Sequence, residues 1–492
     1  MRRHVTTKRS TSRRVAAAVL AVCLVSSGAA VVGAGAAHAV DPDRLRPGCV
    51  WRTAEDQANH VQTCSWHSES LGREVTVQVR PSDQQPGQTE RGVYFLDGLG
   101  SSPAYSSWSL PIAGAVENYS PADNLVMPTG GSGEWMTNWR TAPTGAASAP
   151  QWETFLSSEL PSYLYSNFDV GQHNNAIVGV SMSAGPAIIT GLDHPETFSV
   201  MRAYSGYYET DNPLGWLAIP LIQISRSGIT NGLWGMWGSP LSPGNNWAHN
   251  SVARRLVTEP APPQTIIVST GNGLLSPAEI DAQNAATAAV WRDHPEQLPA
   301  FLFSSADGVV VGGALESAAF GSTLLLQAAT TAVGLPVRYR YSSGGHNWLA
   351  WGDDAHADAQ EVDAALDAAA AGTSTSSMQS PSAAPTSPTR SSPVSPTGVA
   401  RELSSLPTAL PEPVRQAVGS AAAALGSLVD VLSGNEFQIR PLCQNRVDDV
   451  AAQVPDVVVQ SDADGIEAVG DVAIGHLRRR MRHEDVVVGA PG

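Results

Sequence analysis

Between residues 49 and 371, short apolar runs rich in β-branched residues alternate with stretches of helical periodicity. The apolar runs have the length of strands and lie at 75–79, 93–96, 125–126, 177–180, 266–268 and 337–341. Helical patterns occur between them, at 152–165, 186–194 and 278–291. Strands that alternate with helices predict a largely parallel central sheet with helices on both faces. The sequence therefore predicts an α/β fold, with one globular domain over residues 40–371.

Residues 1–39 have the pattern of a secretory signal peptide. Basic residues come first, an apolar run at 15–32 follows, and small residues flank His38 as at a cleavage site. Cleavage removes six Lys and Arg residues and no acidic one, which takes the formal net charge from −16 to −22. Such a charge disfavours nucleic acids and anionic membranes as partners. We therefore expect an exported, acidic protein.

Export permits disulfide bonds, and Cys49 and Cys64 lie close enough in sequence to form one near the mature N-terminus. Cys443 is then left without a predicted partner. The tract at 372–398 is rich in Ser, Thr and Pro and predicts a disordered linker. The C-terminal extension, 399–492, contains a helical pattern at 413–432 and is predicted to be mainly helical or disordered, but no motif assigns it a function. After residue 39 no segment has the ~18 consecutive apolar residues of a membrane span.

The sequence GVSMSAGPA at 179–187 directly follows a strand candidate. It fits the nucleophile elbow G-x-S-x-G in two registers, each imperfect. Ser181 has Gly179 two residues before it, whereas Ser183 has Gly185 two residues after it. The glycine at the end of the strand favours Ser181 as the nucleophile. A strand-to-helix turn without any chemistry is the alternative.

A serine hydroxyl needs a histidine to remove its proton and a carboxylate to orient that histidine. His346 follows the last strand candidate in a Gly-rich loop, YSSGGHNW, where a histidine base is expected. Two acids precede it, Asp307 in SSADGVV and Glu316 in GGALES. The residues alone do not separate these two, and each of the three side chains could equally be an ordinary surface group.

A tetrahedral intermediate needs two backbone N–H groups to bind its oxyanion. One is expected from Met182, the residue after the nucleophile. The other is expected from Leu99, in the Gly-rich turn of VYFLDGLGSS at 93–102. An ordinary β-turn is the alternative for this segment, because Asp-Gly is common in turns.

Several segments, in order, resemble the antigen 85 family of mycolyltransferases, which are secreted enzymes with the α/β-hydrolase fold. The resemblance covers about residues 73–366, and its motifs are VYFLDGLG, NLVMPTGG, QWETFLSSELPSYL, IVGVSMSAG, MWGSP, STGNG and GGHNW. It implies that the domain at 40–371 is a catalytic domain with the α/β-hydrolase fold. It implies no metal and no organic cofactor.

The resemblance implies a role for each residue that matches a family motif. Ser181 matches the nucleophile, His346 the base and Glu316 the acid, so that Glu316 is preferred to Asp307. Leu99 and Met182 match the oxyanion-hole positions. A further pair, Asp97 and Trp348, matches residues at the sugar-binding mouth of the family.

The function implied by the resemblance is transfer of a mycoloyl group from trehalose monomycolate, through an acyl-serine intermediate, to a second trehalose monomycolate or to arabinogalactan. The implied location is the cell envelope of a mycolate-bearing actinobacterium, and family analogy adds binding to extracellular-matrix proteins. Two positions depart from the family: Gly100 replaces an arginine that contacts the sugar, and Thr270 replaces a cysteine. A secreted carboxylesterase with the same triad and a wall-associated binding protein are the alternatives.

The segment 212–250 contains four tryptophans, Trp216, Trp234, Trp237 and Trp247. They could line a groove for an acyl chain or could pack in a core. The sequence does not decide between these interpretations.

Overall fold

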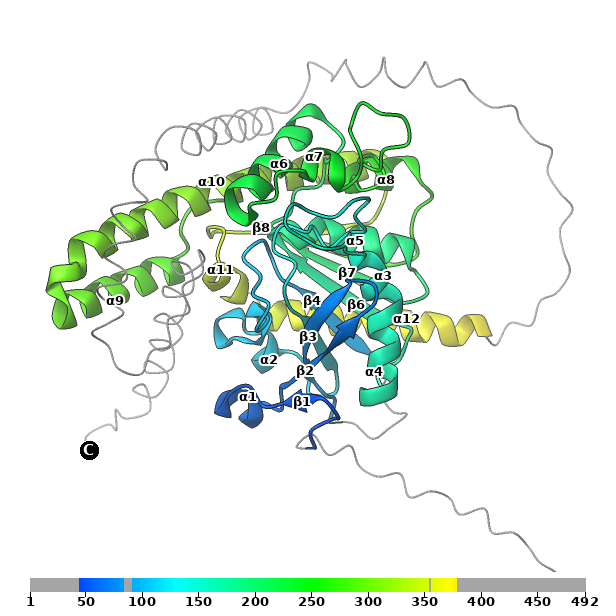
Figure 1. Cartoon of the computed structure of the whole chain (residues 1–492), viewed down its shortest axis with the longest axis horizontal. Coiled ribbons are helices and arrows are strands. Elements are labelled where there is room, and N and C mark those ends of the chain that lie inside the picture. The colour runs from blue at the N-terminus through cyan, green and yellow to red at the C-terminus, as the bar shows by residue number, and fades with distance from the viewer. Residues whose placement is uncertain (1–43, 84–90, 354, 378–492) are drawn as a thin grey trace, which may run out of the picture. The chain divides into compact units, whose positions relative to one another are not determined.

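A computed structural model describes residues 44–83, 91–353 and 355–377 (Figure 1). The predicted signal peptide, the extension at 399–492 and Cys443 lie outside the described residues, as does the linker from residue 378 onward. Residues 372–377 belong to the last described helix, which ends at Ser377.

The described residues form a sheet of nine strands in the order β1-β2-β3-β5-β4-β6-β7-β8-β9. The strands are β1 (Cys49–Val50), β2 (Gln62–Ser68), β3 (Arg73–Arg80), β4 (Gly92–Leu96), β5 (Asn124–Pro128), β6 (Asn175–Val180), β7 (Phe198–Tyr204), β8 (Thr265–Gly271) and β9 (Arg338–Ser342). Pairing is antiparallel from β1 to β5 and parallel from β5 to β9. The predicted α/β fold with a mostly parallel sheet is confirmed, and it is the architecture of an α/β hydrolase.

Each strand and helix predicted between residues 49 and 371 overlaps an observed element, whereas the helical pattern at 413–432 lies outside the described residues. Several elements were not predicted. The helices are α1 (Ala54–Ala58), α2 (Ala115–Asn118), α3 (Trp152–Thr154), α4 (Leu160–Phe168), α5 (Ala184–Asp193), α6 (Pro213–Ser227), α7 (Gly232–Gly235), α8 (Val252–Thr258), α9 (Pro277–Asp293), α10 (Leu298–Ala332), α11 (Trp348–Asp353) and α12 (Ala355–Ser377). Short 3₁₀ turns are η1 (Ser107–Ser109), η2 (Pro111–Ala113), η4 (Ser181–Ser183) and η5 (Pro295–Gln297), and η3 (Phe155–Glu159) is a π-helical turn. The strands β1, β2 and β7 were missed, and α10 is the longest of the missed helices.

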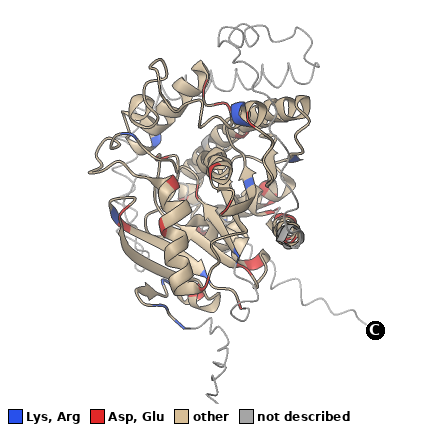
Figure 2. Ribbon diagram, turned by 90° about the vertical axis from the view of Figure 1, so that its right-hand side faces the viewer, with Lys and Arg blue, Asp and Glu red and all other residues tan. Residues whose placement is uncertain are grey.

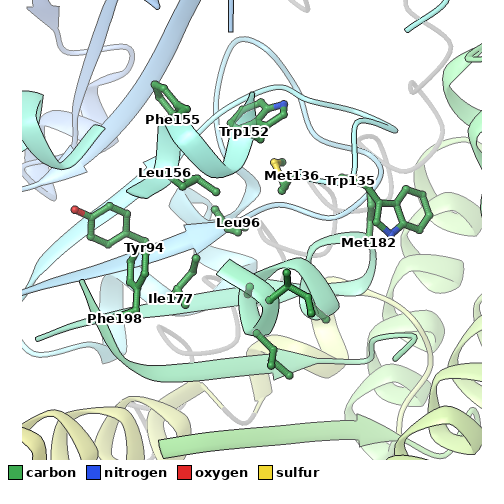
Figure 3. Packing of buried hydrophobic residues seen from close by; sticks show 14 of the residues in the cluster. Tyr94, Leu96, Trp135, Met136, Trp152, Phe155, Leu156, Ile177, Met182 and Phe198 are labelled. Carbon is green, nitrogen blue, oxygen red and sulfur yellow. The ribbon is translucent and has the colours of Figure 1, made fainter. Parts of the chain in front are cut away.

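Strands β4 to β8 are buried on both faces, as expected for strands covered by helices, whereas the edge strand β9 has no buried residue. Along β4 the side chains alternate between two hydrophobic clusters, Val93 and Phe95 in one and Tyr94 and Leu96 in the other. Helices α4, α5 and α8 and the second half of α10 contribute to the first cluster, which is drawn in part in Figure 3. Helices α2 and α12 contribute to the second. The strand ends that carry the site are therefore held between two packed layers.

A buried ion pair joins β7 to α12. The guanidinium of Arg202 lies 2.8 Å from the carboxylate of Asp358, and both side chains are 0 % exposed. Arg202 also donates to Ser269 Oγ at 2.7 Å, and its guanidinium carbon lies 3.8 Å from the ring centroid of Tyr204. The other arginines are scattered among the described elements (Figure 2).

Two further features bear on the predictions for export and membranes. Cys49 and Cys64 form a disulfide between β1 and β2. Within the described residues, one helical stretch, Pro295–Ala332, is long and apolar enough to cross a membrane by length and composition. Polar residues interrupt this stretch, so the criterion of consecutive apolar residues does not find it in the sequence.

Candidate active site

Ser181 lies at the turn between β6 and α5, the first residue after the strand. Its φ is +56°, in the left-handed region that side chains rarely adopt. A Cβ atom added at Gly179 would lie 2.3 Å from the carbonyl oxygen of Ser183, so only glycine fits there. A strained serine between a strand and a helix, with an obligatory glycine two residues before it, has the geometry of a nucleophile elbow.

Three side chains that are far apart in sequence meet at this turn. His346 Nε2 lies 2.7 Å from Ser181 Oγ, and His346 Nδ1 lies 2.7 Å from Glu316 Oε2. His346 comes from the loop between β9 and α11, and Glu316 from the middle of α10. The main chain also joins the two, because His346 N–H donates to the carbonyl of Gly312 at 3.2 Å. Such a chain of contacts can move the serine proton onto the imidazole and stabilise the imidazolium.

Glu316 is 1 % exposed, and the second oxygen of its carboxylate accepts hydrogen bonds from β8 and from the residue after β7. Gly271 N–H donates at 2.5 Å, Thr270 Oγ at 2.9 Å and Ser205 Oγ at 2.7 Å. A buried carboxylate requires partners of this kind, because its desolvation is costly. The bonds to Oε1 leave Oε2 directed at His346.

Ser205 and Trp351 complete this network, and neither was predicted from the sequence. The indole N–H of Trp351 donates to Ser205 Oγ at 2.9 Å, and indole can only donate. Ser205 therefore uses its own proton for Glu316. The φ of Ser205 is +51°, and a polar residue in this strained conformation directly after a strand cannot be recognised from sequence alone.

The structure also separates the alternatives that the residues left open. Asp307 lies in the same helix as Glu316, about 13 Å away along the axis at ~1.5 Å per residue. Ser183 is 0 % exposed, and its hydroxyl bonds to Val180 N–H and to the carbonyl of Leu96, both at 2.9 Å. Of the two candidate acids, Glu316 is the one that contacts His346, and of the two candidate serines it is Ser181.

The turn after β4 passes directly beside the serine. A Cβ atom added at Gly98 would lie 3.3 Å from Ser181 Cβ. The next residue, Leu99, is held by its carbonyl, which accepts from Ser132 Oγ at 2.6 Å. Met182 follows Ser181 and is 5 % exposed. The two predicted oxyanion donors therefore belong to the turn that passes beside the serine and to the residue that follows it.

Asp97 is the first residue after β4, and Trp348 is the first residue of α11. Asp97 is only 1 % exposed, and its two oxygens accept from Ser107 N–H at 3.1 and 3.2 Å. Burial raises the pKa of Asp97 to about 7. Trp348 packs edge-on against Trp108, with ring centroids 4.9 Å apart. Asp97 thus lies inside the protein rather than at an open mouth.

Of the four tryptophans at 212–250, two are core residues. Trp237 and Trp247 are each 1 % exposed and pack edge-on, 4.9 Å between centroids. Trp234 is 57 % exposed, on α7. Trp216 is partly buried and packs against the same core cluster. Packing therefore explains Trp237 and Trp247, and Trp234 is the most exposed of the four indoles.

Comparisons with known proteins identify the family of this chain. Residues 68–358 match the family model Esterase, described as "Putative esterase". The mycolyltransferase Ag85A of Mycobacterium leprae, a "diacylglycerol acyltransferase/mycolyltransferase", is 30 % identical over 274 residues, which are 55 % of this chain and 76 % of the relative. Ag85B of Mycobacterium intracellulare, named in the same way, is 28 % identical over 309 residues, which are 62 % of this chain and 83 % of that protein.

The crystal structure of MPT51 (FbpC1) from Mycobacterium tuberculosis is similar with a TM-score of 0.47 and 21 % identity, and covers 61 % of this chain and 98 % of that one. The family match extends over more than half of the chain, and it includes each of Ser181, Glu316 and His346. The chain belongs to the esterase family, as an antigen 85-like member, and is an acyl-transferring enzyme of the hydrolase type.

Proposed function

We propose that this protein is a secreted serine acyltransferase that transfers mycoloyl groups from trehalose monomycolate to a second trehalose monomycolate or to cell-envelope arabinogalactan. The observation that carries the proposal is the relay Ser181–His346–Glu316, with both contacts at 2.7 Å. The acyl group and the sugar come from the names and the family of the relatives. The location in the envelope rests on the predicted signal peptide and on the same relatives.

In the first half of the reaction, Ser181 Oγ attacks the carbonyl carbon of the donor ester while His346 Nε2 takes the hydroxyl proton. The carbonyl oxygen becomes an oxyanion, which the N–H groups of Leu99 and Met182 stabilise. The C–O bond to trehalose then breaks, and His346 gives its proton to the departing sugar oxygen. An acyl-serine remains.

In the second half, a hydroxyl of the acceptor sugar occupies the place of the departed trehalose. His346 removes its proton, and the alkoxide attacks the acyl-serine carbonyl. Collapse of the second tetrahedral intermediate returns the proton to Ser181 Oγ. Glu316 stays ionised throughout and stabilises the imidazolium formed in each half.

For the sugar, we propose contact with Trp348, which lies at the start of α11 close to His346 in sequence. The buried Asp97 would act on the sugar only after a change in its surroundings, so its first role is to hold the turn that carries Leu99. Gly100 offers no side chain to the sugar, which leaves one fewer contact than the family's arginine provides.

A carboxylesterase that uses water as the acceptor is the second candidate function. Gly100 favours it, because weaker binding of an acceptor sugar gives water an advantage at the acyl-serine. The family match to an esterase is compatible with either outcome.

Purified mature protein incubated with trehalose monomycolate distinguishes the two functions. A transferase produces trehalose dimycolate and free trehalose, whereas free mycolic acid without dimycolate would establish the esterase. A fluorophosphonate probe should label the wild type and Ser183→Ala but not Ser181→Ala. Equal labelling of Ser181→Ala would remove the proposed nucleophile.

A further inference from the structure

Helix α9, the turn η5 and the first half of α10 form a helical hairpin, which we call the arm (residues 277–315). Figure 1 shows it extending from the sheet as two antiparallel helices. In α9 the buried residues are Glu279 and Ala286. From 298 to 315, none of the residues with a described side chain is buried, whereas α10 is anchored from Glu316 onward. The arm is therefore exposed along most of its length.

The exposed side chains of the arm are mainly apolar and large. Phe303 is 71 % exposed, Trp291 and Val310 are each 65 % exposed, and Leu302 and Ile280 are close to half exposed. Soluble proteins seldom expose so many large apolar side chains in one place. A partner that removes this surface from water is therefore implied.

The distribution of these side chains favours lipid over a protein partner. In α10 the runs 301–303 and 309–311 are apolar at consecutive positions, and consecutive residues point about 100° apart around a helix. Apolar side chains therefore point in several directions around the first half of α10 instead of forming one stripe, and Ser304, Ser305 and Asp307 separate the two runs. A protein partner or a second copy covers one face, but apolar side chains on several faces of a helix are suited to a surrounding apolar medium.

Length decides how the arm can meet a lipid layer. The segment from Leu298 to Val311 is about 20 Å long at ~1.5 Å per residue, shorter than the ~30 Å hydrocarbon core of a bilayer. The rest of α10 packs on β8 and carries the buried Glu316. The full stretch Pro295–Ala332 therefore cannot cross a membrane in this fold, and the exposed half can only insert into one leaflet.

The charge of the arm indicates which lipids it would bind. Residues 277–315 contain five acidic residues and one basic residue, Arg292, which is paired with Asp293. Anionic headgroups would be repelled. Uncharged or zwitterionic headgroups would not, so the binding should be driven by apolar burial and should be insensitive to salt.

We propose that the arm is a lipid-docking element that inserts into the surface of an uncharged or zwitterionic lipid layer. The arm joins the body at the active site, because Gly312 contacts His346 through the main chain and Glu316 follows one turn later. Docking would thus hold the site at the lipid surface. The use of this surface as a source of acyl donor rests on the proposed function, whereas the binding itself does not.

The test is flotation of the full mature chain, residues 40–492, with vesicles of phosphatidylcholine. We expect the protein to float with the vesicles at low and at high salt. The double variant Phe303→Ser/Val310→Ser should bind at least about 10-fold more weakly, because two large apolar side chains no longer enter the lipid. Both side chains are exposed, so the variant should fold, and an unchanged melting temperature checks this.

The matched control is Leu241→Ser, since Leu241 is 86 % exposed but lies outside the arm. It should bind like the wild type, as should Ser181→Ala, which separates docking from catalysis. Absence of wild-type binding, or equal binding by the double variant, would overturn the proposal. So would a wild-type dimer in sedimentation velocity that the double variant loses without any lipid binding, because a second copy would then be the occupant.

Discussion

The imidazole of His346 packs edge-on against the indole of Trp351, with ring centroids 5.0 Å apart. The same indole donates a hydrogen bond to Ser205, which in turn donates to Glu316. Trp351 therefore contacts the proposed base directly and the proposed acid through one hydroxyl. We infer that it is a positioning residue for both.

Trp351→Phe should keep most of the ring contact and remove the hydrogen bond to Ser205. We expect kcat to fall about 3- to 10-fold with little change in KM, because a hydrogen bond of this kind contributes ~1 kcal/mol. Steady-state kinetics on a soluble ester measure this. Trp66→Phe is the control, since Trp66 stacks on Tyr163 away from the relay. An unchanged kcat in Trp351→Phe, or a change confined to KM, would contradict the positioning role.

Ser183→Ala should lower stability without abolishing reactivity at Ser181. The Ser183 hydroxyl links β6 to β4 inside the protein, and its loss leaves the buried N–H of Val180 without that partner. We expect a loss of about 1–3 kcal/mol in the free energy of unfolding, measured by urea denaturation. The fluorophosphonate probe should still label the variant at a temperature below its melting point. Loss of labelling in a folded variant would mean that Ser183 takes part in the chemistry.

Gly179→Ala should disrupt the turn that presents Ser181. The added Cβ would lie 2.3 Å from the backbone oxygen of Ser183, so the main chain must shift. We expect activity to fall at least about 100-fold even if the variant folds, because a displacement of about 1 Å at a reacting atom has this effect. Gly308→Ala is the control: nothing lies within 4 Å of the added atom, and the helix should be slightly stabilised. Near-normal activity of Gly179→Ala would contradict the elbow geometry.

Asp358→Ala should destabilise the protein strongly, because it leaves Arg202 charged and buried. The expected loss is about 3–5 kcal/mol in the free energy of unfolding. Asp211→Ala removes a partner of Arg254 at the surface and should cost less than about 1 kcal/mol. Urea denaturation of the two variants makes the comparison. Equal losses would show that burial does not increase the contribution of the Arg202–Asp358 pair to the free energy of unfolding.

Asp97 predicts a pH dependence of stability. Its pKa is raised from 3.8 to about 7 by burial, so between these values the folded protein binds the proton that the unfolded chain releases. Stability should therefore fall as pH rises from about 4 to 7, and the contribution of Asp97 should then level off. Thermal melts of the wild type and of Asp97→Asn from pH 4 to 8 test this, since the asparagine should flatten the slope. Parallel curves for the two proteins would show that Asp97 is not protonated when folded.

The sequence predicted the elements whose patterns are local. Strand β6 and the glycine at its end were recognisable because an apolar run and a glycine before a serine are patterns that span only a few consecutive residues. Strand β7 was missed because Arg202 interrupts its apolar pattern, and that arginine is tolerated only because Asp358, 156 residues away, neutralises it. Helix α10 was missed because Gly308, Gly312 and Gly313 argue against a helix.

The residue types of the site were likewise determined by the sequence, but their partnership was not. Composition and spacing left Asp307 and Glu316 equivalent as acids, and Ser181 and Ser183 both compatible with an elbow. Only the tertiary structure brings α10, the loop after β9 and the turn after β6 to one point, and it does so by burying both faces of the sheet. A hydrogen bond about 2.7 Å long between residues 165 apart depends on that packing, and no local pattern encodes it.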